Sequence, residues 1–288
     1  MGVFTYSNPR VIHWGAGSIE HLEELQATRV AVVTTRSLLD RLHQLPVWPA
    51  CVVTIGQHAP IAQIDAAVEA VRGADAVVSF GGGSAIDAAK MISVRLGALP
   101  HTAVPTTLSV AELAAGAGYT NEQGDKAGMR DPRLMVETVI YDAELTLGTP
   151  MQLWLSTGIR ALDHAVEGFL ADGEHPFNDV MALEGIRRLF ASLPGAKESP
   201  EDLDMRTENQ LAAWFSFTLP GPSAGGLSHT MGKQIGARHG IPHGVTSCLL
   251  LPHVMRYLAR SMPDRPPRNR DHRCVAASPP YRPAAQAR

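Results

Sequence analysis

The chain has 288 residues, a formal net charge of −3 and a hydrophobic content of 45%. This length suits one large domain or two ordinary ones, and the balanced charge excludes the basic surface of a typical nucleic-acid-binding protein. No apolar run reaches the roughly 18 residues that a membrane span needs, and residues 1–10 carry no secretion signal. The three cysteines, Cys51, Cys248 and Cys274, are scattered and favour reduced thiols, so we expect a cytoplasmic protein.

The first half of the chain alternates short β-branched runs with helical patterns. Strands are predicted at residues 29–35, 51–55, 74–80, 102–104 and 136–141. Helices are predicted at residues 37–45, 61–72 and 84–96. Strands separated by helices predict a parallel sheet with both faces covered. We therefore expect an α/β nucleotide-binding domain over residues 1–149.

The pattern changes after residue 150, where the composition becomes rich in alanine and leucine. Helices are predicted at residues 153–170, 178–193, 202–218, 224–239 and 244–259. They predict an all-helical second domain over residues 150–262. Residues 263–288 are rich in proline and arginine and have no periodicity, so we expect a disordered tail.

A glycine-rich turn follows the strand predicted at residues 74–80 and opens the next helix. It contains Gly81, Gly82, Gly83 and Ser84, with Asp87 one turn later. Glycines let the backbone approach a pyrophosphate, and a helix N-terminus offers free N–H groups. The spacing differs from the G-x-G-x-x-G dinucleotide fingerprint, and an ordinary turn is the alternative.

Two further sets of residues point to ligand binding. Thr106 and Thr107 follow the next strand, where their hydroxyls suit phosphate or ribose, with an ordinary turn as the alternative. His164, His229 and His243 lie in the helical half, and a turn at residues 240–242 can bring His243 back beside His229. Histidine is the commonest metal ligand, while three unrelated polar histidines are the alternative.

These segments, from about residue 6 to residue 257, resemble the iron-containing alcohol dehydrogenase family, which includes the maleylacetate reductases. The resemblance implies a dehydroquinate synthase-like fold, with an α/β nucleotide-binding domain followed by an all-α domain. It also implies NAD(H) or NADP(H) bound at the residues of the glycine turn and of the threonine pair. A homodimer is expected from the same resemblance.

The metal site of the family is altered in this chain. Family members hold the metal with an Asp and a His four residues apart, followed by two later His residues. The Asp position reads Arg160, whereas His164, His229 and His243 match, so the resemblance implies an Fe²⁺ or Zn²⁺ site whose fourth ligand is replaced. A guanidinium cannot ligate a cation. Asp163 is expected to point elsewhere on the helix.

Arg160 favours an anionic substrate, because a guanidinium binds a carboxylate through two parallel hydrogen bonds. The spacing from Thr107 to Glu112 matches the maleylacetate reductase branch. We therefore expect an NAD(P)H-dependent oxidoreductase that reduces maleylacetate to 3-oxoadipate. Arg160 would supply fixed positive charge, His243 would donate a proton or polarise the substrate, and Lys233 would add a second cation.

The cofactor preference depends on one position at the end of the first predicted strand. Family members that prefer NAD often carry Asp where this chain has Thr35, and Arg36 follows it. Loss of the acid removes repulsion of a 2′-phosphate, so we expect NADPH to be accepted, unless Arg36 is merely solvated.

Three alternatives remain open at this point. Three histidines and a water can hold Zn²⁺, which would give a metal-dependent alcohol or aldehyde dehydrogenase. The family continues with further helices after residue 257, so a truncated, inactive nucleotide-binding remnant is the second alternative. For Arg160 itself, an ion pair with Asp163 or Glu167 on the same helix is the structural alternative.

Overall fold

The computed structural model describes residues 8–171, 175–217 and 226–261. Its main sheet has six strands in the order β1-β8-β5-β4-β2-β3, and every neighbouring pair is parallel. The strands are β1 (Val11–Trp14), β2 (Val30–Thr34), β3 (Cys51–Thr54), β4 (Ala76–Gly81), β5 (His101–Pro105) and β8 (Thr138–Tyr141). The predicted parallel sheet is therefore confirmed.

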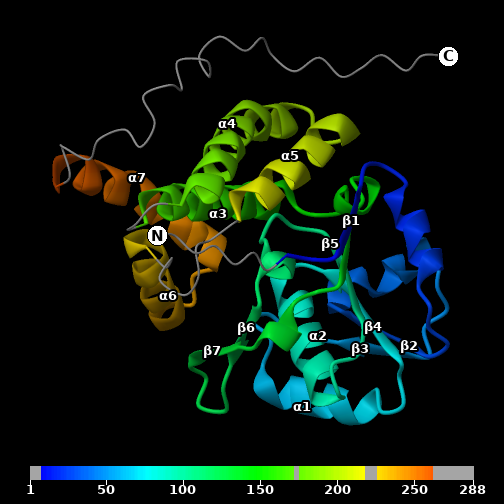
Figure 1. Cartoon of the computed structure of the whole chain (residues 1–288). Coiled ribbons are helices and arrows are strands. Elements are labelled where there is room, and N and C mark those ends of the chain that lie inside the picture. Colours follow the sequence, from blue (N-terminus) through cyan, green and yellow to red (C-terminus); the bar gives the residue numbers. More distant parts are fainter. Residues whose placement is uncertain (1–7, 172–174, 218–225, 262–288) are drawn as a thin grey trace, which may run out of the picture.

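Helices cover the sheet on both faces (Figure 1). On one face lie α1 (Ile61–Ala70) and α2 (Gly83–Arg95), which pack through a core of aliphatic side chains against β2 and β4. On the other face lie the 3-10 helices η1 (Ser18–Glu24) and η2 (Arg36–Gln44). Strands β2 and β4 are buried along their whole length, which explains their continuous apolar sequences.

The order of the strands locates the ligand crevice. From β2, the chain moves outward to β3 and then returns to place β4 on the opposite side of β2. In open α/β sheets, ligands bind at such a reversal, beyond the carboxyl ends of the strands. Thr34 and Phe80 lie opposite each other there, and the Thr34 hydroxyl donates to the Phe80 carbonyl oxygen at 2.8 Å. The glycine turn therefore begins at the edge of this crevice.

Several elements of the first half differ from the prediction. The segment predicted as a helix at residues 37–45 is a 3-10 helix, and β1 at the sheet edge was not predicted. A separate antiparallel hairpin, β6 (Gly116–Thr120) and β7 (Lys126–Arg130), was also missed. Its strands contain glycine and charged residues, so they lack the β-branched alternation that marks a strand.

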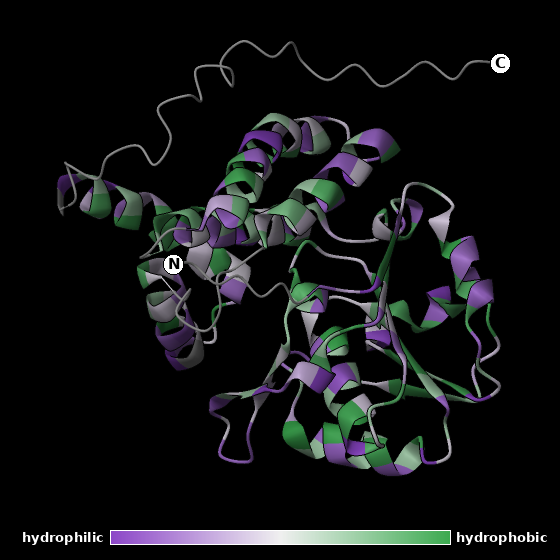
Figure 2. Cartoon of the chain, in the orientation of Figure 1, coloured by the Kyte–Doolittle hydropathy of each residue, from purple (hydrophilic) through white to green (hydrophobic). Residues whose placement is uncertain are grey.

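The second half is helical, as predicted. Its long helices are α3 (Met151–Leu170), α4 (Pro176–Glu198), α5 (Leu203–Ser216), α6 (Leu227–His239) and α7 (His243–Ser261). Their shared core surrounds Trp154, which is fully buried. The Trp154 Nε1 donates to Asn209 at 2.9 Å, and the guanidinium of Arg206 lies 4.6 Å from the ring centroid. Hydrophilic and hydrophobic bands alternate along α4 and α5, as expected for helices that bury one side (Figure 2).

The predicted domain division falls between the last strand of the sheet, which ends at Tyr141, and the first long helix, which begins at Met151. The disordered tail predicted for residues 263–288 lies outside the described residues, as do the helix ends predicted at residues 218 and 224. None of the helices described is long and apolar enough to cross a membrane.

Close packing of α3 and α7 gives a prediction about Gly244. A Cβ atom at this position would lie 2.7 Å from the backbone carbonyl oxygen of Ser156, which cannot move without shifting α3. We expect Gly244→Ala to lower the free energy of unfolding by about 1–3 kcal/mol, measured by urea denaturation. Gly128→Ala is the matched control, because its Cβ would make an ordinary 3.6 Å contact. Equal stability of the two variants would contradict the close approach.

Candidate active site

The glycine turn after β4 is shaped by a backbone that other residues rarely adopt. Gly81 has a φ of 150°, and Gly82 and Gly83 carry the chain into α2. A Cβ on Gly82 would lie 3.0 Å from Thr107, and one on Gly83 would lie 3.3 Å from the Ser109 hydroxyl. The turn therefore packs directly against the segment after β5, and the residues predicted as two separate motifs form one cradle.

Unpartnered hydroxyls lie in this cradle. The Thr107 and Ser109 hydroxyl oxygens are buried and have no hydrogen-bond partner. Buried hydroxyls are normally paired, so an orphan pair beside a glycine turn indicates a place for an outside acceptor. The N-terminus of α2 points its free N–H groups toward the same region, which suits the phosphates of a nucleotide. Thr106 is buried beside them, and its backbone N donates to the Gly81 carbonyl oxygen at 3.0 Å.

The polar residues that follow the turn brace its surroundings. Ser84 accepts a hydrogen bond from the His58 backbone N at 2.9 Å. Asp87 accepts one from the Gly118 backbone N at 3.0 Å, and burial raises the pKa of its carboxyl to about 6. The completely buried Lys90 donates to backbone carbonyls of Ala111, Ala114 and Gly116, the last two at 2.7 and 2.9 Å. This lysine fixes the backbone between β5 and the hairpin.

Glu112, which marks the reductase spacing in the sequence, is buried in the same region. Its Oε1 accepts a hydrogen bond from the Tyr141 hydroxyl at 2.7 Å, and burial raises the pKa of the Glu112 carboxyl. Sequence reasoning assigned no contact to either residue. In the structure, the pair ties the segment after β5 to the end of β8.

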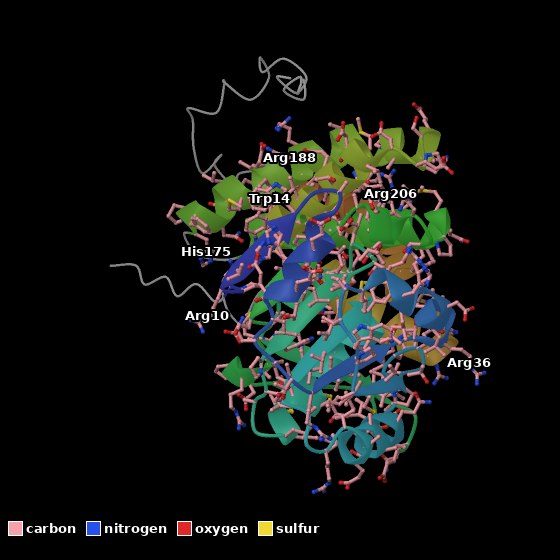
Figure 3. The ribbon with its side chains drawn as sticks, turned by 90° about the vertical axis from the view of Figure 1, so that its right-hand side faces the viewer. Arg10, Trp14, Arg36, His175, Arg188 and Arg206 are labelled. Carbon is pink, nitrogen blue, oxygen red and sulfur yellow. The ribbon has the colours of Figure 1, made fainter. Side chains whose placement is uncertain are left out.

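Thr35 and Arg36 stand at the end of β2, beside the crevice. The Thr35 hydroxyl lies 3.1 Å from that of Ser37, and Arg36 extends into solvent (Figure 3). No acidic side chain stands at these two positions. The exposed Arg36 supplies positive charge beside Thr35, and tolerance of a 2′-phosphate at this place stays a prediction.

The three predicted histidines come together from three helices. The ring centroid of His229 on α6 lies 5.4 Å from that of His164 on α3 and 5.2 Å from that of His243 on α7. The turn at residues 240–242, with Gly240 at a φ of 65°, brings His243 beside His229 as expected from the sequence. The His243 Nε2 is buried without a partner. This nitrogen is available to a ligand.

Arg160 lies within the histidine cluster and is almost completely buried. Its Nη1 donates to Asp163 at 3.0 Å and to the Ser247 hydroxyl at 3.1 Å, and its Nη2 contacts His229 Nδ1. Asp163 also accepts hydrogen bonds from the hydroxyls of Ser228 at 3.1 Å and Ser247 at 2.6 Å. Burial lowers the pKa of Arg160 to about 10, so the guanidinium stays charged at neutral pH.

The expectation that Asp163 points elsewhere is wrong. Residues three apart on a helix share a face, and the Arg160 side chain is long enough to fold back onto that carboxylate. The structural alternative, an ion pair with Asp163, is therefore present. It holds the guanidinium in place within the cluster.

The cluster does not fit a divalent cation. The Arg160 Nη2 contacts His229 Nδ1 and lies 3.4 Å from His229 Nε2, so the guanidinium borders both ring nitrogens, and its charge repels a cation. Within residues 8–171, 175–217 and 226–261, only His13, His21 and Glu24 bring three ligand atoms within 4.8 Å of one another. The three site histidines meet at ring contact without reaching that convergence.

Positive charge gathers around His243 from both halves of the chain. Burial, and then the charges of Arg160, Lys126, Lys233 and His58, lower the pKa of His243 to about 3. Lys126 lies on β7 of the hairpin and His58 in the loop before α1, with 2.9 Å between the Lys126 Nζ and the His58 Nδ1. His243 is thus neutral at neutral pH and lies among cationic side chains.

The pKa values of two other basic side chains, Lys233 and His164, are lowered in a similar way. Burial lowers the pKa of Lys233, and the charges of Arg160 and Arg130 lower it further. His164 is partly buried, and removal from solvent, followed by the charge of Arg160, holds its pKa well below the usual value. A site with this charge is suited to an anion.

Comparison with known proteins identifies the family. Models of the family match at residues 9–143 (iron-containing alcohol dehydrogenase) and at residues 154–273 (its C-terminal part). The chain belongs to the iron-containing alcohol dehydrogenase family. It is accordingly an NAD(P)-dependent oxidoreductase, and the predicted α/β plus all-α fold is that of the family.

Several relatives within this family belong to the predicted maleylacetate reductase branch. A maleylacetate reductase of Rhizobium sp. is 34% identical over 91% of this chain and 77% of its own length. The crystal structure of maleylacetate reductase from Agrobacterium tumefaciens superposes with a TM-score of 0.83 at 33% identity, covering 92% of this chain and 78% of its own. A sulfoacetaldehyde reductase from Bifidobacterium kashiwanohense, solved with NAD+, is 27% identical over 90% of this chain and 77% of its own, with a TM-score of 0.79.

Sequence reasoning missed the residues that support the cluster. Ser228 precedes His229 and Ser247 follows His243 by one helical turn, so their proximity to a predicted ligand was the available signal. Lys126 and His58 belong to a hairpin and a loop that the pattern did not predict. Glu167 was named from the sequence only as a possible ion-pair partner of Arg160, and in the structure its Oε1 accepts a hydrogen bond from the His229 backbone N at 3.1 Å.

Glu167 gives a prediction about pH. Burial, and then the charge of Asp163, raise its pKa from 4.5 to about 7, so the folded protein binds a proton that the unfolded chain releases. The contribution to stability is complete at pH values below 4.5 and is lost as pH rises through about 7. Relative to Glu167→Gln, the wild type should lose stability between about pH 5 and about pH 8, measured by urea unfolding. If the free energies of unfolding of the two proteins changed in parallel with pH, the raised pKa of Glu167 would be refuted.

Proposed function

We propose that this chain reduces maleylacetate to 3-oxoadipate with NADH or NADPH as the hydride donor. The observation that carries the proposal is Arg160, a buried guanidinium at the centre of the histidine cluster, where the family holds a metal-ligating Asp. It is supported by the positive charges of Lys126 and Lys233 and by relatives named maleylacetate reductase. The substrate is a dicarboxylate, so its charge matches the cations that gather around His243 from both halves of the chain.

The cofactor is assigned to the cradle between the glycine turn and the threonine segment. Gly81, Gly82 and Gly83 allow the phosphates to approach the backbone, and Thr107 and Ser109 offer their unpartnered hydroxyls. Asp87, Thr106 and Ser84 border the same cradle. The bound nicotinamide supplies a hydride to the substrate.

Reduction of the activated double bond sends charge onto the neighbouring ketone oxygen. A hydride that adds to the alkene carbon remote from the ketone converts the conjugated system into an enolate, and a proton then returns to the carbon next to the carbonyl. The enolate oxygen and the substrate carboxylates are negative, so fixed donors placed beforehand stabilise them. Arg160 Nη2, now in contact with His229, is the donor that a substrate oxygen would meet.

The remaining groups have distinct roles in the proposal. His243 is neutral and has a free Nε2, so it acts as a hydrogen-bonding polariser. Lys233, whose pKa is lowered, is the cation best suited to exchange a proton with the enolate. His164 and His229 orient the substrate. The chemistry proposed for these residues needs no metal, because Arg160 occupies the place of the cation.

Arg160 is tested by its removal. We expect Arg160→Met to lower kcat/KM for maleylacetate at least about 30-fold, or about 2 kcal/mol, in an assay of NADH oxidation. The double variant Arg160→Met with Asp163→Asn also replaces the Asp163 carboxylate that the single variant leaves unpaired. If its activity is equally low, the missing guanidinium, and not a disturbed fold, causes the loss. Arg188→Met, on α4 and paired with Glu184 and Glu208, is the control and should retain activity.

The assay also separates the alternative functions. Activity on maleylacetate that survives chelator treatment supports the proposal. Chelator-sensitive turnover of small aldehydes would instead indicate a metal-dependent alcohol or aldehyde dehydrogenase, despite Arg160. Nucleotide binding without any turnover would indicate an inactive remnant.

Cofactor choice is a separate prediction at Thr35. Because no carboxylate stands there to repel a 2′-phosphate, NADPH should support at least about a tenth of the NADH rate at equal concentration. Thr35→Asp should reduce the NADPH rate and leave the NADH rate nearly unchanged, since it restores the repulsion. A wild-type NADPH rate below that level would refute the assignment.

A further inference from the structure

A second cluster of ligand-type side chains lies outside the proposed active site, where β1 meets η1. His13 comes from the edge strand β1, and His21 and Glu24 come from η1. The ligand atoms of these three residues all lie within 4.8 Å of one another. Nothing in the proposed reaction uses them. Two imidazoles and a carboxylate form a donor set that suits zinc and neighbouring transition metals.

The backbone places the three side chains together. In a 3-10 helix, residues three apart lie directly above each other, which aligns His21 with Glu24. The His21 Nδ1 lies 2.7 Å from the Glu24 Oε1. The turn between β1 and η1, with Gly15 at a φ of 108° and Gly17 at 78°, folds the helix back so that the rings of His13 and His21 stack at 3.9 Å.

The scaffold beneath the cluster is fixed. The Ile19 backbone N donates to Asp142 at 2.9 Å, and Leu22 is buried in the core under the sheet. Trp14, next to His13, lies with its ring centroid 6.4 Å from that of Trp214 on α5, at the junction with the helical half (Figure 3). A ligand at the cluster would therefore meet side chains carried by an ordered strand and helix.

We propose that His13, His21 and Glu24 bind one divalent cation of the zinc class, with water completing the coordination. Zn–N bonds of about 2.0–2.1 Å bring tetrahedral ligand atoms to about 3.4 Å from one another. The rings now stack face to face, so binding requires them to turn until their nitrogens converge. The side chains of His21 and Glu24 are 46% and 68% exposed, which leaves them free to make that rotation. The bound ion would join the sheet edge to η1.

The proposal is independent of the reaction at Arg160. The site belongs to β1 and η1, whereas the catalytic cluster belongs to α3, α6 and α7. Because this site lies outside the proposed reaction, removal of zinc from it by a chelator should leave the rate of maleylacetate reduction unchanged. If the reaction required a metal, a chelator would remove that metal from the histidine cluster around Arg160, and activity would fall.

The test is a calorimetric titration of untagged, chelator-treated full-length protein with ZnCl₂. We expect one site with micromolar affinity, weakened at least roughly tenfold in His21→Ala and in Glu24→Gln. Glu23→Gln, an exposed residue on the same helix, is the matched control and should bind as the wild type does. His243→Ala should also retain the full stoichiometry.

A second measurement follows the histidines directly. Zinc should shift the imidazole proton resonances of His13 and His21 in the wild type, and in Glu24→Gln only at correspondingly higher zinc concentrations, and it should raise the melting temperature of the wild type by a few degrees. Binding that survives in His21→Ala but disappears in His243→Ala would place the metal in the catalytic cluster and overturn the proposal. An absence of saturable binding would reduce the cluster to an exposed His–Glu ion pair and overturn it equally.

Discussion

The buried ion pair between Arg160 and Asp163 is the interaction on which the helical half of the active site depends. One carboxylate receives hydrogen bonds from Arg160 on α3, Ser228 on α6 and Ser247 on α7, so three helices converge on a single acceptor. A buried charge is tolerated only when it is paired and hydrogen-bonded. The pair therefore explains why the guanidinium can remain charged in the interior, beside His164 and His243, whose pKa values burial and then the charge of Arg160 lower.

In the proposed function, the two halves of the site would recognise their ligands by different means. The cradle proposed for the cofactor offers closely approaching backbone and a few hydroxyls, whereas the cluster proposed for the substrate offers fixed charge. The whole chain is slightly acidic, with a net charge of −3, yet Arg160, Lys126 and Lys233 gather around the ring of His243. Such local concentration of one sign of charge attracts anions even when the protein as a whole would repel them.

The features that could be predicted from the sequence are those that depend on local sequence patterns. The strands at β2 and β4 are continuous apolar runs, the turn at residues 81–83 lies between a strand and a helix, and the three histidines follow a family spacing. What it missed depends on contacts between distant segments. Asp163 was read as facing away because helical position was considered without the reach of Arg160. The hairpin carrying Lys126 has no β-branched alternation, so its strands are set by pairing and not by propensity.

The buried amine of Lys90 can serve as a probe of local unfolding. All three hydrogens of its ammonium are donated to backbone carbonyls, and the side chain is sealed from solvent. Reagents that acylate or methylate amines need a free, accessible lone pair, so this lysine can react only when the segment between β5 and the hairpin opens. The rate at which Lys90 is labelled would therefore report how often that segment unfolds locally, as amide exchange does for backbone groups.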